Sequence, residues 1–116
     1  MNRILVIGGF GALGRETAAA LRPLLPAAEV VATGRNPSRA RCVAGTTAIR
    51  LDATDDNNLA GALEDVDAVV MCAELGNVRV ARACLHRGIP YLDVSATPQQ
   101  LSRVVSIFAH EPSPRR

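Results

Sequence analysis

Short apolar runs rich in valine and isoleucine alternate along the chain with longer stretches in which apolar residues recur at helical spacing. Continuous apolar runs, as opposed to strict alternation of apolar and polar residues, are typical of strands that are buried on both faces of a parallel sheet. The runs predict five strands, at residues 4–7, 29–33, 47–51, 67–73 and 91–94.

Between these runs, the spacing of apolar residues and the signals for helix ends predict helices. We expect them at residues 12–22, 37–42, around 59–63, 78–87 and 97–108. Pro23 and Pro26 are predicted to end the first helix, because proline lacks the N–H group that a continuing helix needs. The N-cap of the third helix is predicted to be Thr54, Asp55 or Asp56, whose side chains can accept hydrogen bonds from free amides.

The fourth helix has an apolar side and a basic side. The apolar positions are Val78, Ala81 and Leu85, and the basic positions are Arg79, Arg82 and His86. This pattern predicts an amphipathic helix with its apolar side buried, so that His86 is expected to be solvated. Gly88 follows as the residue that ends the helix.

The alternation of strands and helices predicts an α/β fold of the Rossmann type. We expect a doubly wound parallel sheet of about five strands, in the order 3-2-1-4-5, with helices on both faces. Residues 1–110 are expected to form this domain, and the proline-containing residues 111–116 to form a disordered tail. A chain of 116 residues is expected to hold one domain of this kind and no separate substrate domain.

Composition and charge argue against binding to nucleic acids or to membranes. The 13 basic residues are spread along the chain against 11 acidic residues, which gives a net charge of +2 and no basic stripe. Only 3% of the residues are aromatic, too few for a base-stacking platform. The three cysteines, Cys42, Cys72 and Cys84, fit neither a disulfide framework nor a metal site with Cys-x-x-Cys spacing. We therefore expect a cytoplasmic protein without a metal.

Candidate chemistry lies directly after the first predicted strand. The sequence Gly9-x-Gly11-x-x-Gly14 joins that strand to a helix, as the dinucleotide-binding fingerprint requires. Gly9 is predicted to permit the tight turn, Gly11 to let the backbone approach a pyrophosphate, and Gly14 to let the helix pack closely. The predicted binding segment is Gly9, Phe10, Gly11, Ala12, Leu13 and Gly14. The amides of the helix N-terminus would then face the phosphates.

The end of the second predicted strand indicates which dinucleotide binds. In NAD-binding sites an acidic residue about 20 positions further on holds the ribose hydroxyls. Here the chain reads Gly34-Arg35-Asn36, with no carboxylate between Glu29 and Asp52. An arginine can pair with a 2′-phosphate, which a carboxylate would repel. We therefore predict NADP as the cofactor, bound by Arg35, with Asn36, Ser38 and Arg39 as further donors.

Five segments together resemble the NADP-binding domain of the saccharopine dehydrogenase-like family. They are ILVIGGFGALGRETA (4–18), VVATGRNPSRA (30–40), LDATD (51–55), DAVVMCA (67–73) and ACLHRGIPYLDVSA (83–96). The resemblance covers nearly the whole chain. Its most specific part is the helix that ends in glycine and is followed by Tyr-x-Asp-x-Ser.

The resemblance implies positions for the rest of the cofactor. Asp52 and Ala53 would border the adenine, Cys72 and Ala73 would lie beside the ribose and pyrophosphate, and Ser95 would lie near the nicotinamide end. It also implies an NADP(H)-binding domain of an oxidoreductase. In that family a substrate domain follows, so this chain is expected to be inactive alone, and we identify no catalytic residue in it.

Two other functions fit parts of the sequence. Gly8-x-x-Gly11-x-x-Gly14 also matches the glycine spacing of short-chain and extended short-chain reductases, although their Tyr-x-x-x-Lys pair is impossible in a chain without lysine. A non-catalytic dinucleotide sensor, similar to NmrA-like regulators, would need no catalytic residues. Finally, an exposed edge of the fifth strand and the apolar side of the last helix predict a homodimer through that region.

Overall fold

The structure is a computed structural model that describes residues 2–36 and 43–94. In this part of the chain, five parallel strands form one sheet in the order β3-β2-β1-β4-β5. The strands are β1 (Arg3–Ile7), β2 (Glu29–Gly34), β3 (Thr46–Arg50), β4 (Ala68–Met71) and β5 (Tyr91–Asp93), and the helices are α1 (Ala12–Leu24), α2 (Asp56–Ala62) and α3 (Asn77–Arg87). The predicted fold class and strand order are confirmed. The predictions for residues 37–42, 95 and 97–116 lie outside the described residues.

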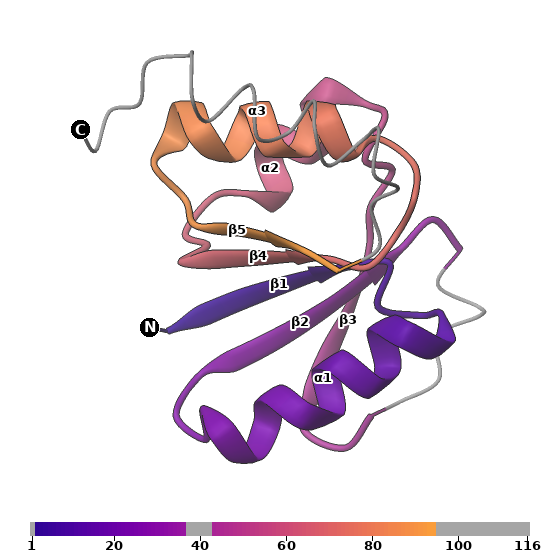
Figure 1. Ribbon diagram of the computed structural model, residues 1–116, viewed down its shortest axis with the longest axis vertical. Helices are drawn as coiled ribbons and strands as arrows, with labels where there is room; N and C mark the ends of the chain where they lie inside the picture. Colours follow the sequence, from indigo (N-terminus) through magenta and orange to yellow (C-terminus); the bar gives the residue numbers. More distant parts are fainter. Residues whose placement is uncertain (1, 37–42, 95–116) are drawn as a thin grey trace.

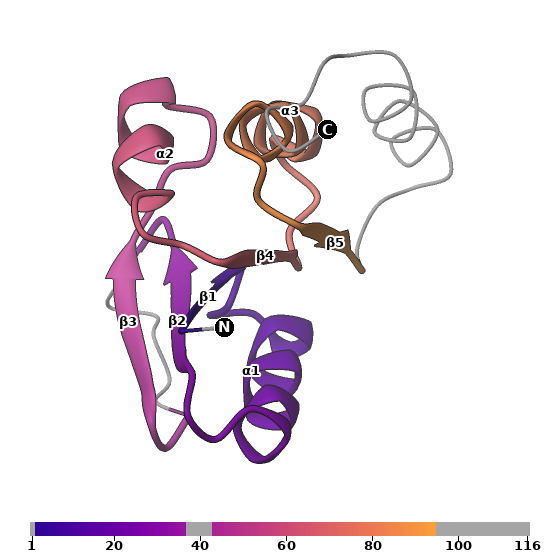
Figure 2. The ribbon, with the colours of Figure 1, turned by 90° about the vertical axis from the view of Figure 1, so that its left-hand side faces the viewer.

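Helices cover both faces of the sheet, with α1 on one face and α2 and α3 on the other (Figures 1 and 2). Successive residues of β1, the central strand, point to opposite layers. Leu5 and Ile7 pack in the cluster that includes Val80 of α3, whereas Val6 packs with Ala18 of α1. All three β1 side chains are buried. This two-sided burial explains why the strand sequence is continuously apolar.

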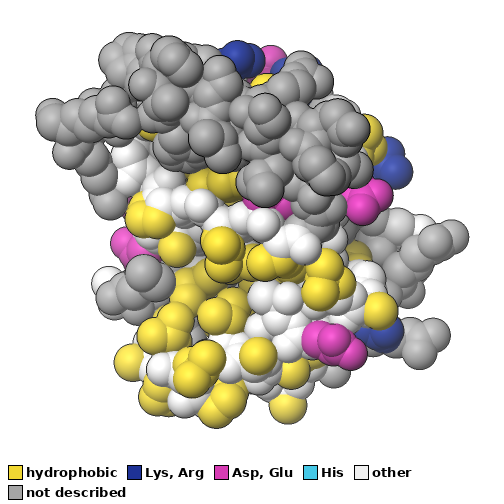
Figure 3. Space-filling model, viewed as in Figure 1, with side chains coloured by type: hydrophobic (Ala, Val, Ile, Leu, Met, Phe, Trp, Pro, Cys, Tyr) yellow, Lys and Arg dark blue, Asp and Glu magenta, His cyan; other side chains and the backbone are white. Residues whose placement is uncertain are grey.

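The first helix, α1, extends beyond the predicted end at residue 22. It continues through Pro23 and ends at Leu24. Proline removes one backbone hydrogen bond, but Pro23 lies in the last turn, and the amide of Leu25 still donates to Leu21 at 2.9 Å. The outer side of this helix is largely apolar, with Leu24 73% exposed, and hydrophobic side chains are visible around α1 in Figure 3.

Of the three candidate caps for α2, the structure selects Asp55. Its carboxylate accepts hydrogen bonds from the amides of Asn57 and Asn58, at 3.0 and 3.1 Å. These two bonds satisfy amides that have no partner within the helix. Asp56 instead pairs with Arg79 of α3.

The buried side of α3 is rotated relative to the prediction. Ala81 and Leu85 are buried as expected, but Val78 is only half-buried, and Val80 and Cys84 fill the core. The side that faces the sheet is therefore centred between the Val80 and Ala81 positions, which the i, i+3, i+7 series did not capture. The basic side is exposed as predicted, and Gly88 ends the helix in a left-handed conformation with φ of 66°. Among the described residues, no helix is both long enough and apolar enough to cross a membrane.

Burial of the Cys84 thiol makes a prediction about alkaline stability. Burial raises the pKa of Cys84 from 9.0 to about 12. The unfolded chain therefore loses this proton at a lower pH than the folded chain does. Stability from the neutral thiol is present below pH 9 and is lost as the pH rises towards 12, at about 1.4 kcal/mol per pH unit.

Urea unfolding at a series of pH values from 8 to 11 tests this expectation. Cys84→Ala should cost stability at pH 8 through the cavity it leaves, but its stability should fall less steeply with pH than that of the wild type. Cys72 and Tyr91 also have raised pKa values and steepen the fall in both proteins, so it is the difference between the two slopes that reports on Cys84. Equal slopes for the two proteins would contradict the assignment.

Candidate functional site

A cleft of about 600 Å³ lies at the carboxyl ends of β1, β2, β3 and β4. The predicted site residues that line it are Phe10, Gly11, Gly34, Arg35, Asn36, Asp52, Ala53, Cys72 and Ala73. In doubly wound sheets, ligands bind at this edge, where the strand order reverses between the first strand and its two neighbours. β1 pairs with β2 on one side and with β4 on the other. The cleft thus lies at the topological switch point.

The loop that follows β1 folds tightly beneath the cleft. Gly8 has φ of 79°, a left-handed conformation that side chains rarely adopt, and a Cβ atom there would lie 2.9 Å from the Ala73 nitrogen. The tight turn assigned to Gly9 is therefore made by Gly8. Gly9 instead lies against β2, where its Cβ would be 2.7 Å from that of Ala32, and its amide donates to Thr33 at 2.8 Å.

The other two glycines of the fingerprint differ in their surroundings. A Cβ atom at Gly14 would lie 2.1 Å from the carbonyl oxygen of Gly8, so the absence of a side chain lets α1 pack directly on the turn. At Gly11 the nearest atom to a Cβ would be the Gly8 carbonyl oxygen at 3.7 Å, an ordinary van der Waals contact, so this position has room for a side chain. Gly11 is also the N-cap of α1, and neither a capping side chain nor an acidic residue of the first turn satisfies the helix amides. Such an uncapped N-terminus suits an anion.

Four predicted residues do not line the cleft. Gly9 packs against Ala32 and Gly14 against the Gly8 carbonyl. Ala12 and Leu13 belong to the first turn of α1, where Leu13 is 44% exposed. Ser95 lies outside the described residues.

The end of β2 presents one basic side chain to the cleft. Arg35 is exposed, directly after Gly34, and the adjacent Asn36 is also exposed. The carbonyl of Gly34 accepts a hydrogen bond from the Leu51 amide at 2.9 Å, which continues the pairing of β2 and β3 to the cleft edge. The backbone that carries Arg35 is therefore anchored to two neighbouring elements, the glycine-rich turn and the end of β3.

The end of β3 presents one acidic side chain. The hydroxyl and amide of Thr54 donate to Asp52 Oδ1 at 2.6 and 3.0 Å. These hydrogen bonds, with smaller contributions from the charges of Arg35 and Arg50, hold the pKa of Asp52 below its usual value. The Asp52 amide also donates to Asn58 Oδ1 at 2.7 Å. Asp52 is thus an oriented, ionised carboxylate at neutral pH.

Cys72 lies just beyond β4, at the inner wall of the cleft. Its thiol is half-buried and donates to the Thr17 hydroxyl at 3.6 Å. Burial raises its pKa, so the sulfur stays protonated at neutral pH and is a poor nucleophile. Cys72 can therefore line a binding site by shape, but it is not suited to covalent chemistry.

Several residues that line the cleft were not in the predicted set. They are Ile7, Gly8, Thr33, Leu51, Thr54 and Leu75. Four of them directly flank predicted residues, so extending each predicted cluster by one residue would include them: Gly8, Thr33, Leu51 and Thr54. Ile7 is the last residue of β1. Leu75, which is 50% exposed, comes from the loop after β4 and has no such signal.

Next to the cleft, a partly buried polar cluster joins β5 to the start of α3. The Asn77 amide donates to Asp93 Oδ2 at 2.7 Å and to the Ala73 carbonyl at 2.9 Å, and the Tyr91 hydroxyl donates to Asp93 Oδ2 at 2.6 Å. Burial, together with the Asp93 carboxylate, raises the pKa of Tyr91, so the phenol stays a donor at neutral pH. The Tyr-x-Asp motif thereby holds the loop that carries Ala73.

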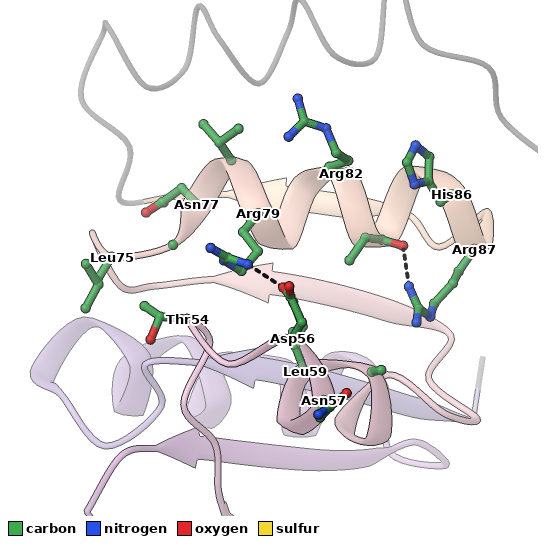
Figure 4. Close-up of a pocket in the computed structure, with 14 residues that line it drawn as sticks. Thr54, Asp56, Asn57, Leu59, Leu75, Asn77, Arg79, Arg82, His86 and Arg87 are labelled. Atoms are coloured by element: carbon green, nitrogen blue, oxygen red, sulfur yellow. Dashed lines mark hydrogen bonds and ion pairs between the residues drawn. The ribbon is translucent and has the colours of Figure 1, made fainter.

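A second groove, of about 920 Å³, lies between α2 and α3 (Figure 4). It carries the basic side of α3, but Arg79 pairs with Asp56 and Arg87 donates to the carbonyl of Ala83 at 3.3 Å. It meets the first cleft at Thr54 and Leu75. Because the glycine-rich turn opens only into the first cleft among the described residues, that cleft is the better candidate for a nucleotide site.

Several solved structures share this fold. A Rossmann-fold NAD(P)-binding family protein from Shigella flexneri has a TM-score of 0.70 at 14% identity, over 92% of this chain and 60% of that chain. Apo saccharopine dehydrogenase (L-Glu forming) from Saccharomyces cerevisiae has a TM-score of 0.67 at 23% identity, over 90% of this chain and 24% of that chain. An NADPH-dependent quinone oxidoreductase from Escherichia coli has a TM-score of 0.61 at 30% identity, over 74% of this chain and 32% of that chain. This chain spans less than two thirds of each of them.

The sequence itself identifies the family. No curated protein matches the chain. The family model described as the saccharopine dehydrogenase NADP binding domain, however, matches residues 4–111, which agrees with the resemblance of the five segments. The protein therefore belongs to the saccharopine dehydrogenase NADP-binding domain family, and the cofactor of this domain is NADP.

Proposed function

We propose that the cleft at the carboxyl ends of β1–β4 is the NADP site and that Arg35 selects NADP(H) over NAD(H). One observation carries this proposal: Arg35 stands at the end of β2, beside the glycine-rich turn, and β2 contributes no carboxylate to the cleft. A guanidinium there can pair with the 2′-phosphate, which is the group that distinguishes the two cofactors.

The remaining parts of the cofactor follow from the chemistry of the cleft wall. The pyrophosphate lies against Gly11 and the N-terminus of α1, where no close contact crowds the backbone and no side chain caps the helix amides, which favours an anion. The adenine borders Asp52 and Ala53, with the ionised Asp52 carboxylate suited to accept a hydrogen bond from the exocyclic amine, and the ribose and pyrophosphate pass beside Cys72 and Ala73. We assign the nicotinamide end to Ser95, which lies outside the described residues.

The domain would serve an oxidoreductase, since hydride transfer is the chemistry that a nicotinamide cofactor supplies. The protein contributes cofactor binding and orientation, and the substrate and the residues that position it are not assigned. A domain that changes its affinity for a partner when NADPH binds, without turnover, would instead be a sensor. The reduced thiols of Cys72 and Cys84 fit a cytoplasmic location.

We further propose that the protein forms a homodimer through β5. This is the outermost strand on its side of the described sheet. Leu92, within the strand, is 58% exposed, and Val94, the residue directly after the strand, is 44% exposed. Exposed strand edges that carry apolar side chains favour association.

Binding titrations test the role of Arg35. NADPH should bind more tightly than NADH, and Arg35→Ala should weaken NADPH binding by about 10- to 100-fold while leaving NADH binding nearly unchanged. Arg35→Asp should reverse the preference. Arg87→Ala is the matched control, because Arg87 is an exposed arginine in the last turn of α3 that does not line this cleft. Equal affinities of the wild type for the two nucleotides would refute the assignment.

The two glycines of the fingerprint should respond differently to the same change. Gly14→Ala should lower the free energy of unfolding by about 1–3 kcal/mol, because its methyl group meets the Gly8 carbonyl, whereas Gly11→Ala should lower it by less than about 1 kcal/mol, the cost of alanine at an N-cap without any overlap. Gly11→Val should keep the fold but bind neither nucleotide. Urea unfolding and nucleotide titration of each variant measure the two effects, and tight binding by Gly11→Val would place the pyrophosphate elsewhere.

The proposed dimer is tested by light scattering coupled to size exclusion. The wild type should have twice the monomer mass, and Leu92→Glu should dissociate it. Thr47→Glu, on the exposed face of the opposite edge strand β3, is the control and should leave the mass unchanged. A monomeric wild type at high concentration would rule out this interface.

A further inference from the structure

Gly34, the last residue of β2, has a conformation that any residue could adopt. It is not among the glycines with positive φ, so its backbone does not require glycine. What a side chain would meet there is the ring of Phe10. A Cβ atom at position 34 would lie 2.2 Å from Phe10 Cδ2 and 2.8 Å from Cγ and Cε2. Real Cβ atoms essentially never approach another carbon so closely, so a side chain at this position would require the ring to move.

The backbone on either side of this contact is fixed. The Gly34 carbonyl accepts from the Leu51 amide at 2.9 Å, and the amide of Gly9, next to Phe10, donates to the Thr33 carbonyl at 2.8 Å. The second bond ties the glycine-rich turn to the end of β2. The ring cannot escape by rotating about its own axis, because Cγ, which lies on that axis, is itself too close. A side chain at residue 34 would have to displace the whole phenyl group.

Position 34 is also where the type of dinucleotide is decided. It lies at the end of β2, about 20 residues after the last glycine of the fingerprint, where NAD-binding sites carry the carboxylate that holds the ribose hydroxyls. Both Phe10 and Gly34 line the cleft beside Arg35. The aromatic ring therefore occupies the room that such a carboxylate would need.

We propose that Phe10 is a specificity-determining residue, whose ring keeps position 34 free of a side chain and so reserves the end of β2 for the 2′-phosphate and Arg35. This inference rests on the proposed function, because it concerns the same cleft. It adds that selectivity has two parts: an attractive group, Arg35, and an aromatic side chain that excludes the competing carboxylate. Specificity commonly combines an attraction with an exclusion of this kind.

Two double-mutant cycles test the proposal. In the first, Gly34→Ala should lower the melting temperature by about 5 °C or more when Phe10 is present, and by much less in the Phe10→Ala background, where the ring is gone. In the second, nucleotide titration compares Gly34→Asp alone with Gly34→Asp combined with Phe10→Ala. The single variant should lose stability and bind both nucleotides weakly. The double variant should regain binding and prefer NADH, shifting the NADPH-to-NADH affinity ratio by about 100-fold relative to Phe10→Ala.

The outcomes separate this inference from the proposed function. If the wild type binds neither nucleotide, the NADP site itself is misplaced. If the wild type prefers NADPH but Gly34→Asp alone is as stable as the wild type and already prefers NADH, the ring excludes nothing and the role of Phe10 is refuted. That role is also refuted if Gly34→Ala lowers the melting temperature equally in both backgrounds, a result that needs no nucleotide to measure.

Discussion

The contact between the first turn of α1 and the loop after β1 determines where the cleft can form. Gly14 rests so closely on the Gly8 carbonyl that a single methyl group would overlap it. The contact holds the N-terminus of α1 against the carboxyl end of the central strand, and β1 is in turn fixed by pairing with β2 and β4. Gly11, the N-cap of α1, thereby lines the cleft beside the end of β1.

The sequence predicts the architecture because the sheet is buried on both faces. Each central strand then has to be apolar without interruption, and such runs are visible in a single sequence, as at residues 4–7. Element ends are harder to predict because they depend on single contacts. Pro23 is accommodated because it falls in a last turn, Asp55 is chosen over two equally suitable neighbours, and the buried side of α3 depends on how the helix is rotated against the sheet.

The glycines show the same division between pattern and contact. The fingerprint correctly locates the turn, since it needs only spacing and context. Which glycine does what depends on neighbours that are distant in sequence: Gly9 is restricted by Ala32 and Gly8 by Ala73. Gly34 belongs to no motif, and its requirement appears only when the ring of Phe10 is placed over it. Leu75 enters the cleft for a similar reason, since only the folded loop brings it there.

The ionisable side chains of the cleft suit binding better than proton transfer. Cys72 is held protonated by burial, and Asp52 is held ionised by Thr54, so neither changes its charge near pH 7. A general acid or base works best when its pKa lies near the working pH, which neither group satisfies.

What the cleft does offer is a fixed charge pattern, with the Asp52 carboxylate at the end of β3 and the Arg35 guanidinium at the end of β2. An adenosine 2′-phosphate has the complementary pattern, with an amine that donates at one end and an anion at the other. In the proposed site, the two side chains would therefore favour one orientation of the nucleotide, because reversing it would bring the phosphate to the carboxylate.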